Sequence, residues 1–149
     1  MSHTTWTDRG LLLLRLAVGV VFVMHGWQKL TVFGLGGLTG FLTQLGIPFP
    51  GVNAVLLSAT ELGGGLALLA GAFTRVAGSL VAFSMLVAVV TVHLKNGFFL
   101  PNGYEFALTL LLANVALTMT GAGAYSVDGL IASRRREPTG ERVPVRLAA

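Results

Sequence analysis

The chain has no cysteine and very few charged residues. Only 11% of its 149 residues are charged, compared with about 25% in a typical soluble domain. The lack of cysteine excludes a disulfide framework and a thiol relay within the chain, and the low charge excludes an ordinary soluble domain. Because 54% of the residues are hydrophobic and the mean hydropathy is +0.78, the composition predicts an integral membrane protein. A chain of this length leaves no room for a sizeable extramembrane domain, so any chemistry must lie between helices.

The charge that is present is mostly positive, with a net value of +4 and a pI near 10.4. A basic chain can bind nucleic acid, but here Arg134, Arg135 and Arg136 follow the last hydrophobic segment. Anionic lipid is therefore the expected counter-charge, and no nucleic-acid partner is predicted.

Apolar segments predict an all-α fold, a polytopic membrane four-helix bundle. The four predicted spans cover about residues 11–30, 52–72, 73–94 and 104–121. Between the first two, Leu38, Phe41, Leu42 and Leu45 recur at helical spacing just before Gly46. This pattern predicts a short helix that lies in the membrane interface.

The distribution of Lys and Arg predicts the topology. Only Lys29 and Lys95 fall on one side of the predicted spans, and the arginines fall on the other. By the positive-inside rule both termini are cytoplasmic. We expect residues 1–131 to form the transmembrane domain and residues 132–149 a mobile basic tail. Arg15, about one and a half turns into the first span, is expected to extend back to the membrane surface.

One carboxylate, Glu61, lies inside the second predicted span, where residues 52–73 are otherwise apolar or small. An ionisable group at this depth is costly unless it is paired, protonated or facing a polar cavity. Glu61 is therefore the first functional candidate. The alternative is a protonated acid that only forms a hydrogen bond with a neighbouring helix.

The other polar side chains of the spans converge on the same outer half of the predicted bundle. They are His25, Gln28 and Lys29, which share one helix face, together with Glu61, His93 and Glu105. Side chains at i, i+3 and i+4 lie on one face of a helix. We predict His25 and Glu61 as catalytic residues and the other four as ligand-binding residues. The alternative is that His25 forms only an interhelical hydrogen bond and that His93 and Glu105 are solvated at the surface.

A quinone headgroup fits this set of residues better than a metal or a haem. No E-x-x-H pair is present, so a di-iron site of the usual bundle type is unsupported, and no metal is predicted. His25 and His93 lie on diagonal helices of an up-down bundle, but their depths differ by several ångströms, which disfavours a haem between them. A quinone needs a donor for each carbonyl and an apolar slot for its tail, and histidine can also move protons.

Other patterns concern helix packing. A ladder of small residues, Ala59, Gly63, Ala67 and Gly71, predicts a close approach by a neighbouring helix. Asn114 and Thr118 lie on the face of the fourth span opposite Glu105 and are expected to form hydrogen bonds between helices or at an oligomer contact.

Several motifs together resemble one known family. They are R15-L-A-V-G-V-V-F, H25-G-W-Q-K29, G46-I-P-F-P, E61-L-G-G-G, L69-A-G-A-F-T-R75, His93 with N96-G-F-F, Y104-E-F and G123-A-Y-S-V-D128. This ordered set, from residue 9 to residue 131, resembles the DoxX family of small bacterial and archaeal membrane proteins.

The resemblance implies a four-helix protein of the cytoplasmic membrane. Some relatives are described as subunits of thiosulfate:quinone oxidoreductase, and others as membrane partners of thiol and superoxide defence enzymes. The family's recurring polar positions correspond here to His25, Lys29, Glu61, His93 and Glu105. Arg75 and Asp128 also match family motifs, and we interpret them as topology and helix-capping groups.

Three functions remain open from the sequence. The first is a redox-linked membrane subunit with a quinone or small-ligand site in the outer half; if it is an enzyme, it is an oxidoreductase subunit of the thiosulfate:quinone type. The second is a non-catalytic accessory or assembly subunit of a larger complex, with a protein partner or a second copy. The third is a proton-linked carrier, which the lack of a visible inverted repeat disfavours.

Overall fold

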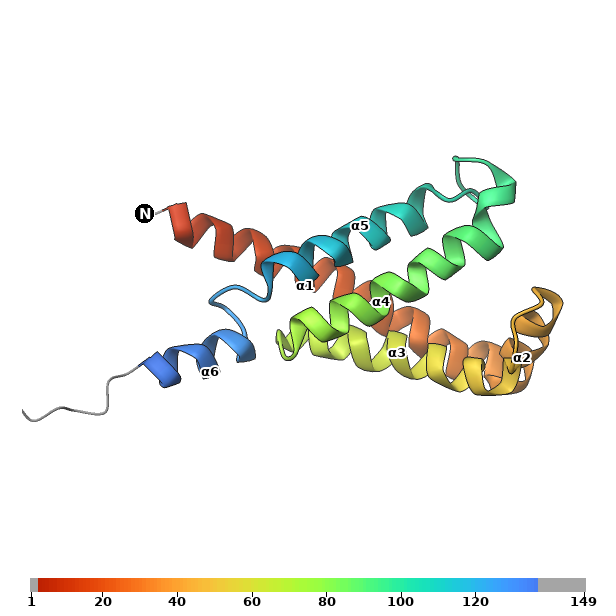
Figure 1. Cartoon of the computed structure of the whole chain (residues 1–149), viewed down its shortest axis with the longest axis horizontal. Helices are drawn as coiled ribbons and strands as arrows, with labels where there is room; N and C mark the ends of the chain where they lie inside the picture. Colours follow the sequence, from red (N-terminus) through yellow and green to blue (C-terminus); the bar gives the residue numbers. More distant parts are fainter. Residues whose placement is uncertain (1–2, 137–149) are drawn as a thin grey trace, which may run out of the picture.

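The computed structural model describes residues 3–136, and within this range every regular element is helical (Figure 1). The six α-helices are α1 (His3–Gln28), α2 (Gly34–Gln44), α3 (Pro50–Ala70), α4 (Thr74–Ala88), α5 (Glu105–Thr120) and α6 (Val127–Arg136). Two π-helical turns, η1 (Lys29–Phe33) and η2 (Val89–His93), extend α1 and α4, and a 3₁₀ turn, η3 (Leu94–Asn96), follows η2.

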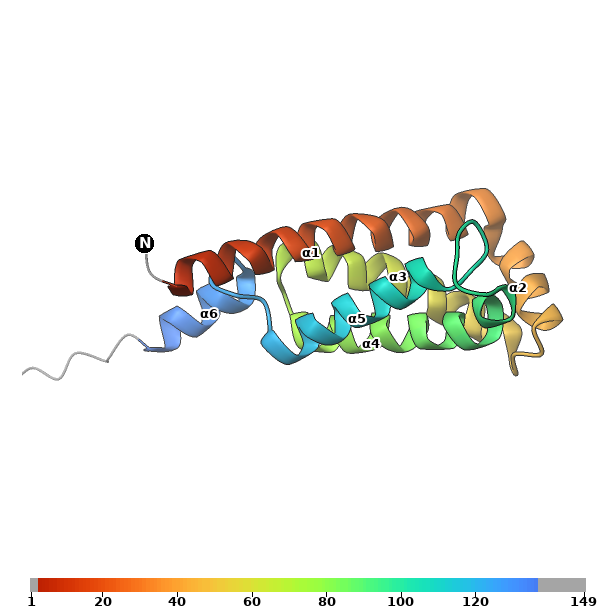
Figure 2. The ribbon, with the colours of Figure 1, turned by 90° about the horizontal axis from the view of Figure 1, so that it is seen from above.

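Three helical stretches are long and apolar enough to cross a membrane: Thr5–Gln44, Pro50–Ala70 and Thr74–Asn96. The fourth, α5, is apolar but has only 16 residues, which span roughly 24 Å at 1.5 Å per residue. The four long helices form a ring in which α1 packs on α3, α3 on α4, α4 on α5 and α5 on α1 (Figure 2). The prediction of an all-α membrane bundle is therefore confirmed.

The bend after η1 creates the short helix between the first two spans. Gly34 has φ 66° and ψ 160°, a backbone conformation that ends the first helix and redirects the chain. From there α2 packs against α3 by burying Leu38 and Leu42 beside Ala54. The predicted short helix is thus present. We call this end of the bundle the α2 end.

The first described residues of α1 and all of α6 lie together at the opposite end, which we call the α6 end (Figure 1). The two ends of the described chain lie at the same end of the bundle, as expected for a chain that crosses the membrane an even number of times. That this side is cytoplasmic stays a prediction from the charge distribution. Residues 137–149, which make up most of the predicted tail, lie outside the described residues.

Glycine allows α1 and α3 to pack closely near the α2 end. A Cβ atom on Gly26 would lie 2.5 Å from the backbone nitrogen of Leu62, and one on Gly65 would lie 2.7 Å from that of Val23. The two backbones therefore touch here, because neither glycine has a side chain in the way. In contrast, Ala59 and Gly63 of the predicted ladder are exposed.

Arg15 does not extend to the membrane surface, and this prediction was wrong. Its side chain is completely buried and donates to the carbonyl oxygens of Leu68, at 3.4 Å, and Tyr125, at 2.5 Å. The guanidinium fills the space beside Gly71, where a Cβ would clash with it. Two backbone carbonyls accept hydrogen bonds from the terminal nitrogens of the guanidinium, which holds the cation inside the protein, although its Nε atom has no partner among the described residues.

Two other predicted packing groups can be compared with the structure. Asp128 caps α4 by accepting hydrogen bonds from the backbone nitrogens of Phe73 and Thr74, at 2.8 and 2.9 Å, which confirms its capping role. Asn114 is fully buried, and its amide donates to Leu110 of its own helix. The predicted hydrogen bond from Asn114 to another helix is not formed, and its burial excludes an oligomer contact.

Arg15 gives a test of this packing. Arg15→Gln removes the hydrogen bonds that the guanidinium donates to the Leu68 and Tyr125 carbonyls, so we expect it to lower the stability of the bundle by about 1–3 kcal/mol. Arg134→Gln, at an exposed position of α6, should change stability by less than about 0.5 kcal/mol. Thermal denaturation in detergent measures both. Equal losses of stability for the two variants would show that the hydrogen bonds of Arg15 do not stabilise the α6 end.

Candidate functional site

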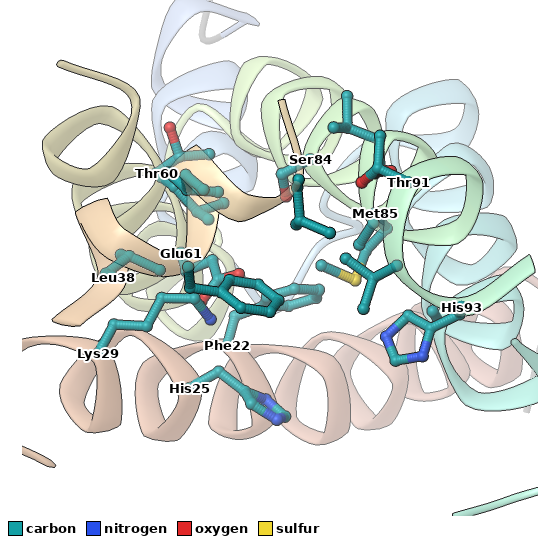
Figure 3. A pocket seen from close by; sticks show the side chains of 18 of the residues that line it. Phe22, His25, Lys29, Leu38, Thr60, Glu61, Ser84, Met85, Thr91 and His93 are labelled. Atoms are coloured by element: carbon teal, nitrogen blue, oxygen red, sulfur yellow. Dashed lines mark hydrogen bonds and ion pairs between the residues drawn. The ribbon is translucent and has the colours of Figure 1, made fainter. Parts of the chain in front are cut away.

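A large cavity of about 1060 Å³ lies at the α2 end, surrounded by the four long helices, α2 and the loop before α5. Its wall is mostly apolar, with Phe22, Leu57, Met85 and Leu110 among the lining residues. A small number of polar side chains face this apolar space (Figure 3). A mainly apolar cavity with a few placed polar groups is the usual form of a small-molecule site.

An ion pair between α1 and α3 forms one wall of the cavity. The Nζ atom of Lys29, the first residue of η1, lies 2.5 Å from Oε2 of Glu61 (Figure 3). Glu61 is 2% exposed, and the close approach at Gly26 brings the two helices near enough for this contact. In a low-dielectric interior each charge stabilises the other, and either one alone would be costly.

Two histidines line the cavity. Nδ1 of His25 lies 3.0 Å from the carbonyl oxygen of Val21, and its ring is 6.4 Å from that of Phe106 on α5. Nδ1 of His93 lies 3.0 Å from the carbonyl oxygen of Asn102, in the loop before α5. A carbonyl only accepts, so each Nδ1 donates, and in the neutral ring each Nε2 is left as an acceptor.

The structure brings five of the six predicted site residues to one cavity. His25, Lys29, Glu61 and His93 line it, and the exposed Gln28 lies at its edge. His25 lies on the α1 wall one turn before Lys29, whereas His93 lies across the cavity from the ion pair (Figure 3).

Glu105 is the exception. Its Oε1 accepts a hydrogen bond from the backbone nitrogen of Leu100 at 2.8 Å, and Glu105 is not among the lining residues. It therefore fixes the loop that carries Leu100 and Pro101 to the cavity wall. The side chains that α5 itself contributes to the lining are apolar: Phe106, Ala107 and Leu110.

Three hydroxyl groups in the cavity wall were missed by the sequence reasoning. They belong to Thr60, Ser84 and Thr91. Ser84 donates to the carbonyl of Val81, and Thr91 to that of Val87, so their oxygens are available as acceptors. No pattern distinguishes them in the sequence, because hydroxyls in apolar helices commonly bond to the preceding turn.

The chemistry of this arrangement is hydrogen bonding and proton exchange. Within residues 3–136 no three His, Asp or Glu side chains lie close enough together to hold a metal ion. Lys29 is a donor, Glu61 and the histidines can take up or release protons, and the apolar wall keeps bulk water away.

Comparisons with known proteins give one matching family and several relatives. The model of the DoxX family matches residues 10–94. The chain is 34% identical to the Bacillus subtilis (strain 168) protein named "Putative oxidoreductase CatD", over 82% of this chain and 87% of the relative. It is 32% identical to "Inner membrane protein YqjF" of Escherichia coli (strain K12), over 83% of this chain and 93% of that protein.

A further relative from Escherichia coli (strain K12), "Inner membrane protein YphA", is 29% identical over 79% of this chain and 87% of its own length. No solved structure matches the chain.

The ion pair predicts a non-additive response to substitution. Lys29→Met leaves a buried carboxylate without its partner, so we expect a loss of about 2–4 kcal/mol in stability. The double variant Lys29→Met with Glu61→Leu removes both charges and should be more stable than Lys29→Met alone. Thermal denaturation of wild type, both single variants and the double variant in detergent measures the coupling. Additive losses would show that the two side chains do not interact.

Glu105 is predicted to act on the loop rather than on a ligand. Glu105→Ala removes the acceptor for the Leu100 amide, and we expect exchange of that amide with solvent to become at least about tenfold faster. Hydrogen exchange followed by mass spectrometry of the 97–104 segment tests this. Unchanged exchange in that segment would refute the role.

Proposed function

This chain belongs to the DoxX family of membrane proteins, and we propose that it is a redox-linked subunit of the cytoplasmic membrane that binds a quinone-type ligand in the cavity at the α2 end. One relative carries the word oxidoreductase in its name, and two others are named inner membrane proteins. These names support the class of reaction and the location, and the residues of the cavity support the type of ligand.

The observation that carries the proposal is the placement of polar groups on two opposing sides of an apolar cavity. Its volume of about 1060 Å³ is at the upper end of the roughly 300–1,000 Å³ of small-molecule sites. Lys29 and Glu61 lie on one side of the cavity and His93 on the other, with His25 on the α1 wall next to Lys29 (Figure 3). A flat headgroup with an oxygen at each end needs hydrogen-bonding groups on both sides, and this cavity provides them.

The side chains also fit the proton chemistry of such a ligand. A bound quinone would supply two-electron, two-proton chemistry. Lys29 would donate a hydrogen bond to one carbonyl oxygen, and Glu61 beside it would hold or release a proton. The free Nε2 atom of His93 would exchange protons at the other end, and that of His25 would do so from the α1 wall. The electrons would come from a protein partner, in line with a role as a subunit of an oxidoreductase of the thiosulfate:quinone type.

A second candidate is a non-catalytic accessory subunit. The observation that favours it is that Lys29 and Glu61 already satisfy each other at 2.5 Å. Such a pair could serve only to fix the register of α1 on α3.

Extraction of bound quinone separates the two candidates. We expect the full-length protein, purified in mild detergent from its native membrane, to retain quinone detectable by mass spectrometry. Glu61→Gln should lower the amount of retained quinone at least fivefold, because the variant lacks the carboxylate beside Lys29 in the cavity wall. Asp8→Asn is the matched control, since Asp8 contacts Ala124 at the α6 end and lies outside the cavity lining, and should retain the wild-type amount.

Wild-type protein without quinone, or equal retention by Glu61→Gln and wild type, would refute the quinone site. Co-purification of the same partner with wild type and Glu61→Gln, in the absence of quinone, would support the accessory role instead.

A further inference from the structure

A groove of about 360 Å³ lies on the outer surface between α3 and α4. From α3 its floor has Ala59, Gly63 and Ala67, and from α4 its wall has Val76 and Leu80. All of these side chains are small or aliphatic, so the groove is an apolar trough apart from Thr60 at its cavity end.

This groove adjoins the cavity. Leu56, Thr60 and Leu80 line both of them. From this shared wall the groove runs along α3 toward Phe73 at the α6 end. Along α3 from Ala59 to Ala67 it extends roughly 12 Å at 1.5 Å per residue.

The groove exists because residues on one face of α3 lack long side chains. Ala59, Gly63 and Ala67 recur every four residues and so lie one above the other. A Cβ atom on Gly63 would have no heavy atom within 4 Å, so nothing in the described chain fills this space. The exposed side chains of Leu56 and Leu80 border the groove where it meets the cavity.

We propose that this groove holds the apolar tail of the ligand whose headgroup lies in the cavity. The inference rests on the function proposed above and narrows its ligand to a quinone with a long hydrocarbon tail. The shared lining residues are the reason to assign the groove to a tail: a chain that leaves a headgroup in the cavity past Leu56, Thr60 and Leu80 enters the groove. A helix of a second copy packed on the same face would instead close this side of the cavity.

The test compares two quinones with the same headgroup, one with a long isoprenoid tail and one with no tail. Binding of each to the purified full-length protein in detergent is measured for wild type and for Gly63→Leu. Because a Cβ atom at position 63 meets no other heavy atom and the rest of the leucine side chain would occupy the groove, we expect the Kd for the long-tailed quinone to rise at least tenfold. The Kd for the tailless quinone should change less than twofold.

Two further variants complete the design. Ala59→Leu, at another exposed position of the groove, should repeat the effect of Gly63→Leu and guards against a folding defect in one variant. Ala116→Leu adds the same side chain at an exposed position of α5 outside the groove and should alter neither Kd. Thermal denaturation of each variant reports whether it is folded.

The outcomes distinguish this inference from the proposed function. Binding of both quinones with equal effects of Gly63→Leu on each would overturn the tail groove and leave the headgroup site standing. A change of oligomeric mass with an unchanged ratio of the two Kd values would identify the groove as a contact between copies, which also overturns the inference. No binding of either quinone to wild type would overturn the proposed function and the tail groove together.

Discussion

The ion pair between Lys29 and Glu61 is the interaction on which the α2 end of the molecule depends. Each charge is costly in an apolar interior, by about 2.5–3.5 kcal/mol for a charged side chain at the centre of a spanning helix on insertion scales. The pair lies at the point where α1 and α3 approach most closely, next to Gly26 and Leu62. Packing and electrostatics therefore depend on each other here. Gly26 allows α1 and α3 to approach closely, and this approach lets Lys29 and Glu61 form their ion pair.

The two ends of the bundle use a buried cation in different ways. At the α6 end Arg15 is bound by the carbonyls of Leu68 and Tyr125, and its guanidinium fills the space beside Gly71. That cation ties the chain segment before α6 to the bundle. At the α2 end Lys29 is bound by a carboxylate that borders a large cavity. A cation in a closed contact has a structural role, whereas one beside open space can also meet a ligand.

The spans and the short helix α2 could be predicted from the sequence, because apolar length and helical spacing are local properties. The gathering of His25, Lys29, Glu61 and His93 in the same half of the bundle also followed from counting residues along each helix. Which of these side chains meet did not follow, because helix rotation and pairing depend on packing. Lys29 was predicted as a ligand-binding residue, but nothing local showed that it pairs with Glu61.

The remaining differences have the same physical origin. Arg15 was expected at the surface because burial of an unpaired guanidinium is costly. In the structure the carbonyls of Leu68 and Tyr125, from distant segments, accept hydrogen bonds from it in the interior. Glu105 was expected at the site because of its depth, but its carboxylate finds a nearer donor in the Leu100 amide. The prominent small-residue ladder of α3 is largely exposed, whereas the closest helix contacts use Gly26 and Gly65. Sequence spacing identifies a face of a helix but not the partner of that face.

The central claim is that a quinone headgroup binds between Lys29–Glu61 and His93, beside His25, and photolabelling tests it most directly. A quinone with a photoreactive group on its ring, activated in membranes that contain the full chain, should label residues of two segments, 22–33 and 84–93. Excess unlabelled quinone should abolish that labelling. Labelling spread over lipid-facing residues of all four long helices, unaffected by competing quinone, would contradict the account.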